Sequence, residues 1–442
     1  MADNEGVRVL LISTYDLGRQ PFGLASPAAW LRDAGYEVTV ADLSRGPMPR
    51  GAVEEAGFIA FFLPMHTATR LALPLIERVR AANPRARLCA YGLYAPMNER
   101  ALRRAGVDAI FGGEFEQALV EAAAGAVSGN GLARLQFRVP ERAALPPLAA
   151  YAQLAVDGAM KRVGYTEASR GCKHFCRHCP VVPVYRGAFR VVQREVVLED
   201  VRRQVAAGAE HVTFGDADFF NGPGHAMAIV EALHREWPSL TYDVTVKIEH
   251  LLRHRDLLPR LKATGCAFVT SAVESLDDAV LARLAKGHTR ADFEEALKLT
   301  RAADLPLAPT FIPFTPWTTR ASYREFLRAL LEMELPEQVP PIQLAIRLLI
   351  PEGSLLLELP EVLAIIEPFD PRGLCYSWRS ADAELDELCP AIQTAIKHAE
   401  RQRKSRLELF RGIWEMAGCG AWREDPRPAR ATIPYLTEPW YC

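Results

Sequence analysis

The chain has 442 residues, a hydrophobic content of 49% and a formal net charge of −2. This length allows two or three domains with a large apolar core. The near-neutral charge gives no general attraction to nucleic acid or to a membrane surface, so neither is expected as a partner. The N-terminus does not resemble a signal peptide and no apolar run reaches membrane-spanning length, so we expect a cytoplasmic protein. Nine cysteines in so long a chain favour a reducing compartment over a disulfide scaffold.

Strand and helix patterns alternate through the first part of the chain. Short apolar runs, typical of strands buried on both faces, occupy residues 7–13, 36–41, 58–63, 87–91 and 109–111. A helix pattern ends at Asp33, just before Gly35. The alternation predicts a doubly wound, Rossmann-like α/β domain over residues 1–125, in which ligands lie at the carboxyl ends of the strands. Residues 126–160, rich in Gly, Ala and Pro, are expected to be a linker.

A compact group of thiols follows the linker. Cys172, Cys176 and Cys179 have the spacing Cx3Cx2C. Three thiolates so close together can hold three irons of a 4Fe–4S cluster and leave the fourth iron open for catalysis. Two other interpretations remain: a zinc site completed by His174 or His178, and ordinary buried thiols.

The run 169–180 resembles the signature of the radical S-adenosylmethionine (radical SAM) superfamily. The segment 167–172 is similar to the first strand of its branch that carries an N-terminal cobalamin-binding domain. The resemblance implies a 4Fe–4S cluster whose open iron chelates SAM, and an electron from a reductant such as flavodoxin or ferredoxin that cleaves SAM. It also implies a partial (β/α)6 barrel over residues 161–354. Its strands are expected at 165–168, 211–215, 241–247, 268–274, 307–314 and 343–349, with the chemistry at their carboxyl ends.

The N-terminal loops resemble that cobalamin-binding domain, including the turn 112–114, which reads Gly-Gly-Glu. They depart from it in one respect, because the DxHxxG motif that supplies a cobalt-ligating histidine in several cobalamin proteins is absent. His66 is the remaining candidate, against the alternative of a loop histidine bonded to backbone. If cobalamin does not bind, the domain is a scaffold or a docking module.

Polar residues at the expected strand ends are candidates for binding SAM. The resemblance implies that Asp216 and Asp218 meet its amino group, as an anionic acceptor suits an ammonium. Glu274, with Ser275, is implied at the ribose hydroxyls, which a carboxylate can bind in pairs. Arg347 would pair with the SAM carboxylate through its rigid guanidinium. The alternatives are a turn or helix cap for the aspartates, an acid at a helix start for Glu274, and a structural ion pair for Arg347.

Lys247 follows the third expected barrel strand and is a candidate catalytic residue, with a plain ion pair to Glu249 as the alternative. Residues 355–442 are expected to be mostly helical, most clearly over 391–413. The chain ends on Cys442. This tail resembles a small radical SAM group whose tails read Cys-Cys-Ala-Glu-Pro or Cys-selenocysteine-Ala-Glu-Pro, which makes Cys442 a second catalytic candidate. We interpret the stop as a selenocysteine codon read as termination; a frayed terminus without a role is the alternative.

These observations favour a transferase. The first hypothesis is transfer of a SAM-derived methyl group, through cobalamin, to a small-molecule acceptor. The second is transfer of the 3-amino-3-carboxypropyl group to a soft acceptor, such as trivalent arsenic, held by C-terminal thiols. The non-enzymatic alternative is an iron–sulfur or zinc sensor, which would not need residues that bind SAM.

Overall fold

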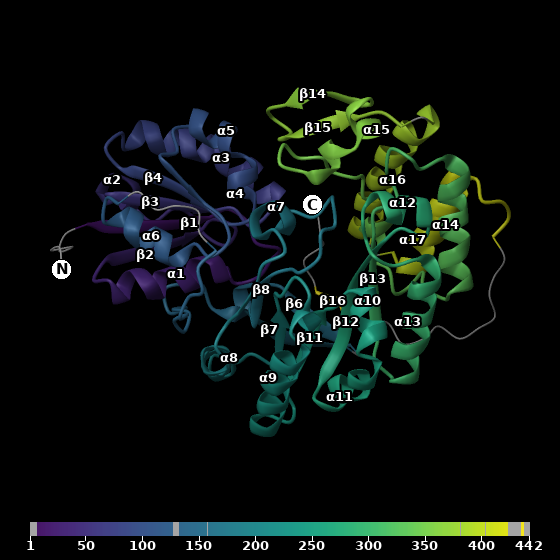
Figure 1. Ribbon diagram of the computed structural model, residues 1–442, viewed down its shortest axis with the longest axis horizontal. Helices are drawn as coiled ribbons and strands as arrows, with labels where there is room; N and C mark the ends of the chain where they lie inside the picture. Colours follow the sequence, from purple (N-terminus) through teal and green to yellow (C-terminus); the bar gives the residue numbers. More distant parts are fainter. Residues whose placement is uncertain are drawn as a thin grey trace.

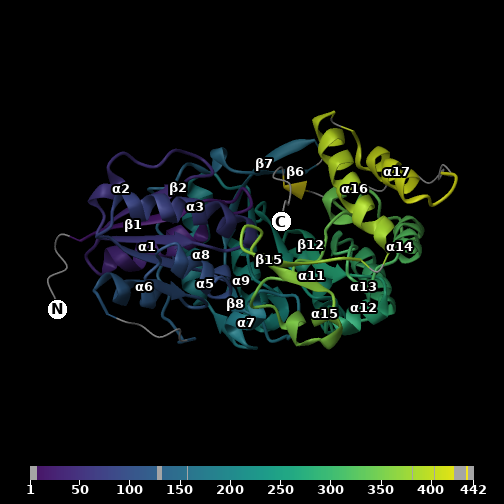
Figure 2. The ribbon, with the colours of Figure 1, turned by 90° about the horizontal axis from the view of Figure 1, so that it is seen from above.

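The computed structural model describes residues 7–126, 132–156, 158–380, 382–402, 404–422 and 435–436. An N-terminal α/β layer stands beside a curled sheet, and C-terminal helices pack at the far side of that sheet (Figure 1). The view from above keeps the same order, with α14 and α17 on the side away from the N-terminal layer (Figure 2). Among the described residues, no helix combines the length and apolar character needed to cross a bilayer.

The N-terminal layer is a parallel sheet with helices on both faces, as expected. Its strand order is β2-β1-β3-β4-β5, the order of flavodoxin-like folds. The strands are β1 (Arg8–Ser13), β2 (Glu37–Asp42), β3 (Phe58–Phe62), β4 (Arg87–Tyr91) and β5 (Ala109–Phe111). The helices are α1 (Phe22–Asp33), α2 (Ala52–Glu55), α3 (His66–Ala82), α4 (Tyr94–Met97), α5 (Glu99–Arg104) and α6 (Glu116–Ala123).

Strand β3 shows why the apolar runs form this sheet. All of its residues are buried, and successive side chains point to opposite faces. Phe58 and Ala60 enter the core under α1 and α6. Ile59 and Phe61 enter the core on the opposite face, under α3. A strand with both faces covered therefore reads as a continuous apolar run.

The second sheet is a curled half-barrel, which confirms the expected fold class. Its order is β13-β12-β11-β10-β7-β6-β16; the members from β7 to β13 pair in parallel, and β6 and β16 add antiparallel pairings at the edge. The strands are β6 (Gln153–Val156), β7 (Ala159–Thr166), β10 (His211–Phe214), β11 (Thr241–Thr245), β12 (Cys266–Glu274), β13 (Leu307–Phe311) and β16 (Tyr435–Leu436).

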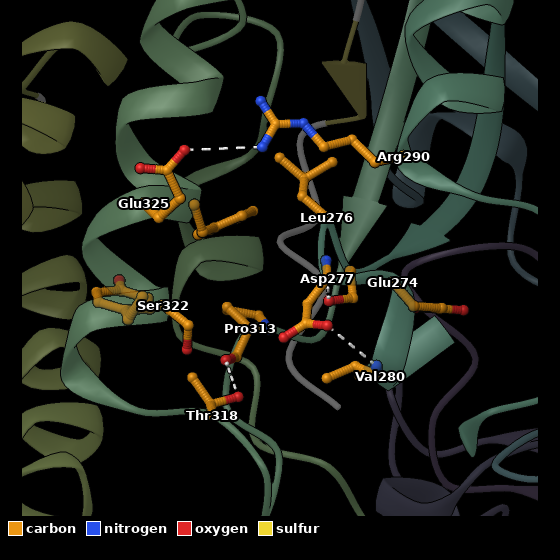
Figure 3. Close-up of a pocket in the computed structure, with 12 residues that line it drawn as sticks. Glu274, Leu276, Asp277, Val280, Arg290, Pro313, Thr318, Ser322 and Glu325 are labelled. Carbon is orange, nitrogen blue, oxygen red and sulfur yellow. Dashed lines mark hydrogen bonds and ion pairs between the residues drawn. The ribbon is translucent and has the colours of Figure 1, made fainter. Parts of the chain in front are cut away.

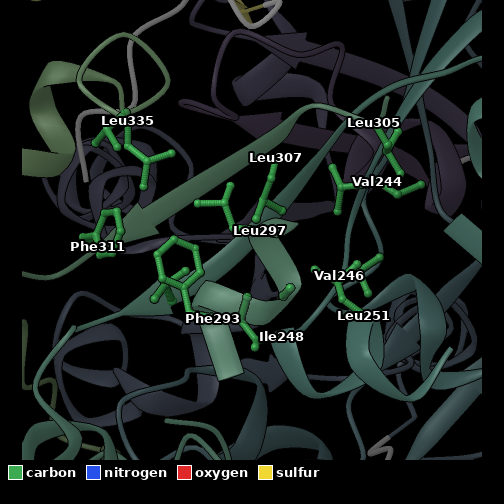
Figure 4. Close-up of a cluster of buried hydrophobic side chains, with 14 of the residues drawn as sticks. Val244, Val246, Ile248, Leu251, Phe293, Leu297, Leu305, Leu307, Phe311 and Leu335 are labelled. Carbon is green, nitrogen blue, oxygen red and sulfur yellow. The ribbon is translucent and has the colours of Figure 1, made fainter. Parts of the chain in front are cut away.

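Helices cover the outside of the half-barrel. They are α8 (Arg194–Ala206), α9 (Pro223–Glu236), α10 (Ile248–Arg253), α11 (Leu258–Ala263), α12 (Asp278–Arg283), α13 (Arg290–Ala302) and α14 (Arg320–Glu332). The side chains of β11, α13 and β13 meet in one apolar core (Figure 4), and residues of α16 (Ala383–Arg401) and α17 (Arg406–Ala417) extend it. The C-terminal helices are therefore part of the barrel's own core.

Short elements complete the described chain. They are η1 (Leu148–Ala150), β8 (Ser169–Gly171), α7 (Val181–Tyr185), β9 (Phe189–Val191), η2 (Phe219–Asn221), η3 (Arg255–Leu257), η4 (Pro341–Leu344), η5 (Leu355–Glu358), α15 (Pro360–Leu363), β14 (Ile366–Asp370) and β15 (Cys375–Trp378). Strands β14 and β15 form an antiparallel hairpin, which the expected mostly helical C-terminal region did not include.

Three expected boundaries are corrected. The sixth barrel strand, expected at 343–349, is reduced to a bridge between Phe314 and Arg347, because η4 occupies its start. The expected linker contains β6, which pairs with β7. The helix expected over 391–413 is the end of α16 and most of α17, because Ser405 caps a new helix through a reciprocal pair of bonds with Glu408.

Candidate functional site

The thiols lie in residues 172–180, the loop between β8 and α7, which we call the thiol loop. Gly171 has φ +75°, and a Cβ there would lie 2.2 Å from the Ala188 carbonyl oxygen, so only glycine fits the turn into the loop. Cys172 and Cys176 are buried, Cys179 is half-buried, and all three are free thiols. Strand β8 and the loop follow the carboxyl end of β7, which is the end of the barrel strands where chemistry collects.

The barrel holds this loop from several sides. The backbone N–H of Arg177 donates to the Leu284 carbonyl at 2.9 Å, and its Nη1 donates to the Arg283 carbonyl at 2.7 Å. The Ser354 hydroxyl donates to the Arg177 carbonyl at 3.3 Å. Lys173 Nζ donates to the Asn221 carbonyl at 2.6 Å. The thiols are therefore presented by a fixed loop, which favours binding of a rigid group.

The surroundings of the thiols suit a metal cluster. Burial raises the pKa of the Cys172 thiol, and it raises that of Cys179 to about 12. Lys247 Nζ lies 3.9 Å from Cys176 Sγ, and the buried Lys286 interacts electrostatically with Cys176 and Cys179. Iron binding deprotonates thiols outright, and the two ammonium groups favour the thiolate charge that results. The donor set fits a 4Fe–4S cluster with one iron left open.

Glu274 ends β12 beside this loop. Its φ of +69° is unusual for a residue with a side chain, and such strain gathers at functional sites. Its Oε1 lies 3.0 Å from His178 Nε2 and 3.2 Å from Lys286 Nζ. Burial opposes ionisation of the carboxyl group, but Lys286 and then His178 outweigh it and hold its pKa at about 2. The carboxylate is therefore charged and in contact with the loop that carries the thiols.

A cavity of about 200 Å³ lies beside Glu274 and Ser275, between the end of β12 and α14 (Figure 3). Its walls are mixed. Asp277, Thr318 and Ser322 supply polar groups, and Val280, Pro313 and Phe326 supply apolar surface. On its rim the Arg290 guanidinium lies 3.7 Å from the Glu325 carboxylate. Ser275 is fixed by a bond from its N–H to the Val273 carbonyl.

The two aspartates after β10 have different surroundings. Asp216 is buried and accepts bonds from the Ala168 N–H, at 2.9 Å, and from the Ser169 hydroxyl. Burial raises the pKa of Asp216 to about 7. Asp218 Oδ1 accepts from the Phe220 N–H at 3.2 Å, so Asp218 caps η2 as the turn alternative expected. Its Oδ2 is directed elsewhere, toward His174 and His250.

Two other residues predicted from the sequence, Arg347 and His66, already have partners within the protein. Arg347 is already paired, because Nη1 donates to Asp386 at 2.8 Å and the guanidinium lies 3.6 Å from the Trp378 ring centroid. His66 Nε2 lies 2.7 Å from the Gly373 carbonyl oxygen, as in the backbone-bonded alternative. Cys442 lies outside the described residues.

A second cavity of about 200 Å³ lies where the two sheets meet. The loops after β1, β3, β4 and β5 line one side, and β7, β8 and Gly215 line the other. Asp16 is in its wall, and burial raises the pKa of that carboxyl to about 7. The cavity is at the carboxyl edge of the N-terminal sheet, where doubly wound folds bind ligands.

A buried ion network beside this cavity was missed by the sequence analysis. Arg170 Nη1 and Nη2 bind both oxygens of Glu116 at 2.9 and 2.6 Å, and Nε binds Glu167 at 2.6 Å. Glu114 Oε2 is 3.8 Å from Arg170, and Glu114 also accepts from the Tyr185 hydroxyl at 3.0 Å. Its signal was present, since Glu114 ends the Gly-Gly-Glu turn and Arg170 precedes the thiols. The network joins the two sheets.

Comparison with known proteins agrees with this geometry. Residues 166–330 match the model of the radical SAM superfamily. Hopanoid C-3 methylase of Methylococcus capsulatus is 29% identical over 175 residues, which are 39% of this chain and 32% of that protein. The ribosomal protein uS12 methylthiotransferase RimO of Syntrophotalea carbinolica is 30% identical over 179 residues, 37% of this chain and 38% of that one. The chain thus spans about a third of these curated relatives.

Solved structures extend the likeness beyond the barrel. A structure of the cobalamin-dependent SAM radical enzyme OxsB with aqua-cobalamin bound superposes with a TM-score of 0.71 over 90% of this chain and 67% of that chain, at 14% identity. The radical SAM methyltransferase TsrM from Kitasatospora setae superposes with a TM-score of 0.56 over 75% of this chain and 72% of that chain, at 16% identity. The N-terminal layer and the half-barrel are thus shared as a fold. With the matched segment, the thiol loop and the half-barrel in agreement, residues 166–330 form a domain of the radical SAM superfamily, whose cofactors are a 4Fe–4S cluster and SAM.

Proposed function

We propose that this protein is a radical SAM transferase whose cluster is held by Cys172, Cys176 and Cys179. The observation that carries the proposal is the contact of His178, within the thiol loop, with the ionised Glu274 at the end of β12. A cluster supplies an electron that breaks a carbon–sulfur bond of SAM. The chain's own part is to fix the thiols, to keep a charged acceptor beside them and to place Lys247 and Lys286 against the sulfur charge.

We assign SAM binding to Glu274 and Ser275, because both line the cavity at the end of β12 and the Glu274 carboxylate contacts His178 of the thiol loop. We give Asp216 the role of a positioning residue, because both oxygens of its carboxyl group already accept hydrogen bonds from Ala168 and Ser169, which lead into the thiol loop. Arg347 would meet the SAM carboxylate only by leaving Asp386, so we give it a structural role. Lys247 stays a candidate for proton or charge control at Cys176.

We further propose methyl transfer through cobalamin, with residues 1–125 as the cobalamin-binding part and 161–354 as the SAM-cleaving part. The cavity between the sheets supports this, because one wall is the carboxyl edge of the N-terminal sheet and the other leads to the thiols. The structures called cobalamin-dependent agree in fold. The cavity holds about 200 Å³, less than the roughly 300–1,000 Å³ of ordinary ligand sites, so cobalamin binding requires its walls to separate. His66 is not in this wall, so we expect no cobalt ligand from it.

The test is anaerobic reconstitution of the cluster, followed by SAM and dithionite with and without cobalamin, and mass spectrometry of the products. S-Adenosylhomocysteine that appears only with cobalamin supports methyl transfer. 5′-Deoxyadenosine alone indicates radical chemistry of another kind. A reconstituted cluster with no SAM-derived product would favour the sensor over the enzyme.

A second candidate is aminocarboxypropyl transfer to a soft acceptor bound by the C-terminal thiol. One observation favours it: β16 is antiparallel to β6, which is antiparallel to β7, so β16 runs toward the carboxyl ends of the barrel strands. Cys442 is six residues beyond Leu436, a separation of at most about 20 Å along the chain. If the wild-type protein forms methylthioadenosine from SAM in the presence of arsenite and Cys442→Ser does not, the result would support this reaction over methylation.

A further inference from the structure

Three side chains from separate elements converge beside the thiol loop. His174 lies in the loop between Cys172 and Cys176, Asp218 follows β10, and His250 is on α10. One nitrogen or oxygen atom from each lies within 4.8 Å of the other two. His250 Nδ1 is 2.6 Å and His174 Nε2 is 3.8 Å from Asp218 Oδ2. None of these groups has a part in the SAM site proposed above.

These atoms are buried and lack satisfactory partners. The Asp218 side chain is fully buried, and that of His250 is 6% exposed. Asp218 Oδ2, His250 Nδ1 and His174 Nε2 each have no hydrogen bond of acceptable geometry among the described residues. The other oxygen of Asp218 is used by the N–H groups of Phe220 and Lys247, so the carboxylate is fixed with Oδ2 directed at the two imidazoles. Unsatisfied polar atoms that face one another in a buried place require an explanation.

We propose that His174, Asp218 and His250 bind a divalent transition-metal ion, separate from the iron–sulfur cluster. Two imidazoles and one carboxylate form the donor set of catalytic zinc sites and of non-haem iron(II) sites, with positions left open. Bonds of 2.0–2.1 Å in tetrahedral geometry put neighbouring ligand atoms about 3.3 Å apart. The observed separations of 2.6 and 3.8 Å bracket that value, so shifts below about 1 Å would centre an ion.

The surroundings of His174 support the same site. Glu249 Oε2 lies 3.5 Å from His174 Nδ1, the ring nitrogen opposite the one that faces Asp218. A carboxylate in this position orients a ligating imidazole and raises its basicity. Because His174 lies between two cluster thiols, the ion would tie the thiol loop to α10 and to the end of β10. The site uses nitrogen and oxygen donors, which distinguishes it from the thiolate site.

Metal analysis of the full-length protein tests this proposal. Anaerobic protein with its cluster reconstituted is equilibrated with Zn²⁺, dialysed and analysed for zinc by mass spectrometry. We expect one tightly bound zinc per chain. His250→Gln and His174→Gln should each weaken zinc binding by more than the roughly 10–100-fold that loss of an outer partner costs. The matched control is His254→Gln, since the His254 ring packs 5.8 Å from that of His250 but is not part of the group.

Cys176→Ala separates this site from the cluster. It should lose the cluster and keep the zinc, and Co²⁺ bound in place of zinc should show no thiolate-to-cobalt charge-transfer absorption. Three results would overturn the proposal: no zinc bound, equal zinc affinity in wild type and His250→Gln, or loss of zinc together with the cluster in Cys176→Ala. None of these results depends on which SAM bond the enzyme breaks.

Discussion

Arg170 and Glu116 form a two-bonded ion pair in the buried interface between the two sheets, with Nη1–Oε2 at 2.9 Å and Nη2–Oε1 at 2.6 Å. Arg170 comes from β8, directly before the thiol loop, and Glu116 begins α6 of the N-terminal layer. Glu116 also accepts from the Ser26 hydroxyl at 2.6 Å. The pair therefore couples the position of the thiol loop to the N-terminal sheet.

Arg170→Met should destabilise the protein by about 3–5 kcal/mol, because it leaves buried carboxylates without their partner. Urea unfolding measures the change. The control is Arg8→Met, which removes ion pairs with Glu37 and Glu55. All three side chains are at least half exposed, so the variant should lose about 1 kcal/mol or less. Equal losses in the two variants would contradict the structural role of Arg170.

Gly215→Ala tests the close contact between the end of β10 and Tyr165, which both line the cavity between the two sheets. A Cβ at Gly215 would lie 1.7 Å from the Tyr165 hydroxyl oxygen, so backbone or ring must move. We expect a loss of about 1–3 kcal/mol, as for overpacking, and weaker cluster retention. Gly224→Ala is the matched control, since nothing lies within 4 Å of its added Cβ in α9. Its stability should be unchanged or slightly higher, and a comparable loss there would argue against a steric cause.

The sequence predicted the N-terminal sheet well because buried parallel strands form continuous apolar runs. It failed where a strand lacks that signal. Pro340 and Pro341 stand just before the expected sixth strand and begin the 3-10 helix η4, which takes up the first residues of that strand. A proline also has no N–H to donate to a neighbouring strand. Strand β6 lies in the segment 126–160, whose Gly, Ala and Pro content predicts a linker, and in the structure only Leu154 of this strand is buried. The hairpin β14–β15 has mostly half-exposed residues and no clear alternation.

Glu274→Gln should weaken SAM binding by about 10–100-fold, since a bond to a charged acceptor contributes about 1.5–3 kcal/mol. It also removes the charge that faces His178 and Lys286. Equilibrium binding of SAM to the reconstituted protein measures the effect. Glu325→Gln, on the rim of the same cavity, should change the affinity less than about threefold. Unchanged affinity in Glu274→Gln would remove Glu274 from the SAM site.

Asp216 predicts a pH dependence of stability. Burial raises its folded-state pKa from 3.8 to about 7, so the folded state binds more protons than the unfolded state between these values. Its contribution to the free energy of unfolding is therefore complete below pH 3.8 and is lost as the pH rises to about 7. The free energy of unfolding, measured with urea, should fall more steeply with rising pH in the wild type than in Asp216→Asn over this range. Parallel profiles would contradict the raised pKa.

The position of the three thiols in one loop could be predicted from the sequence, whereas the polar groups that surround this loop could not. Cx3Cx2C is a local pattern, and its loop is where the sequence indicated. The partner of Arg170 is 54 residues away in the chain, and His250 meets Asp218 only because α10 follows the neighbouring strand. Such contacts depend on sheet order. Sheet order and helix packing also explain why Arg347, which was expected at SAM, forms an ion pair instead: its partner, Asp386, comes from α16, 39 residues further along the chain.

The proposed function depends on SAM cleavage at a cluster held by Cys172, Cys176 and Cys179. The most direct measurement compares SAM-derived products of reconstituted wild-type protein and Cys176→Ala, with dithionite, under strictly anaerobic conditions. We predict 5′-deoxyadenosine, S-adenosylhomocysteine or methylthioadenosine from the wild type and none from the variant. The same products at the same rate from Cys176→Ala would contradict the assignment of the cluster to these thiols.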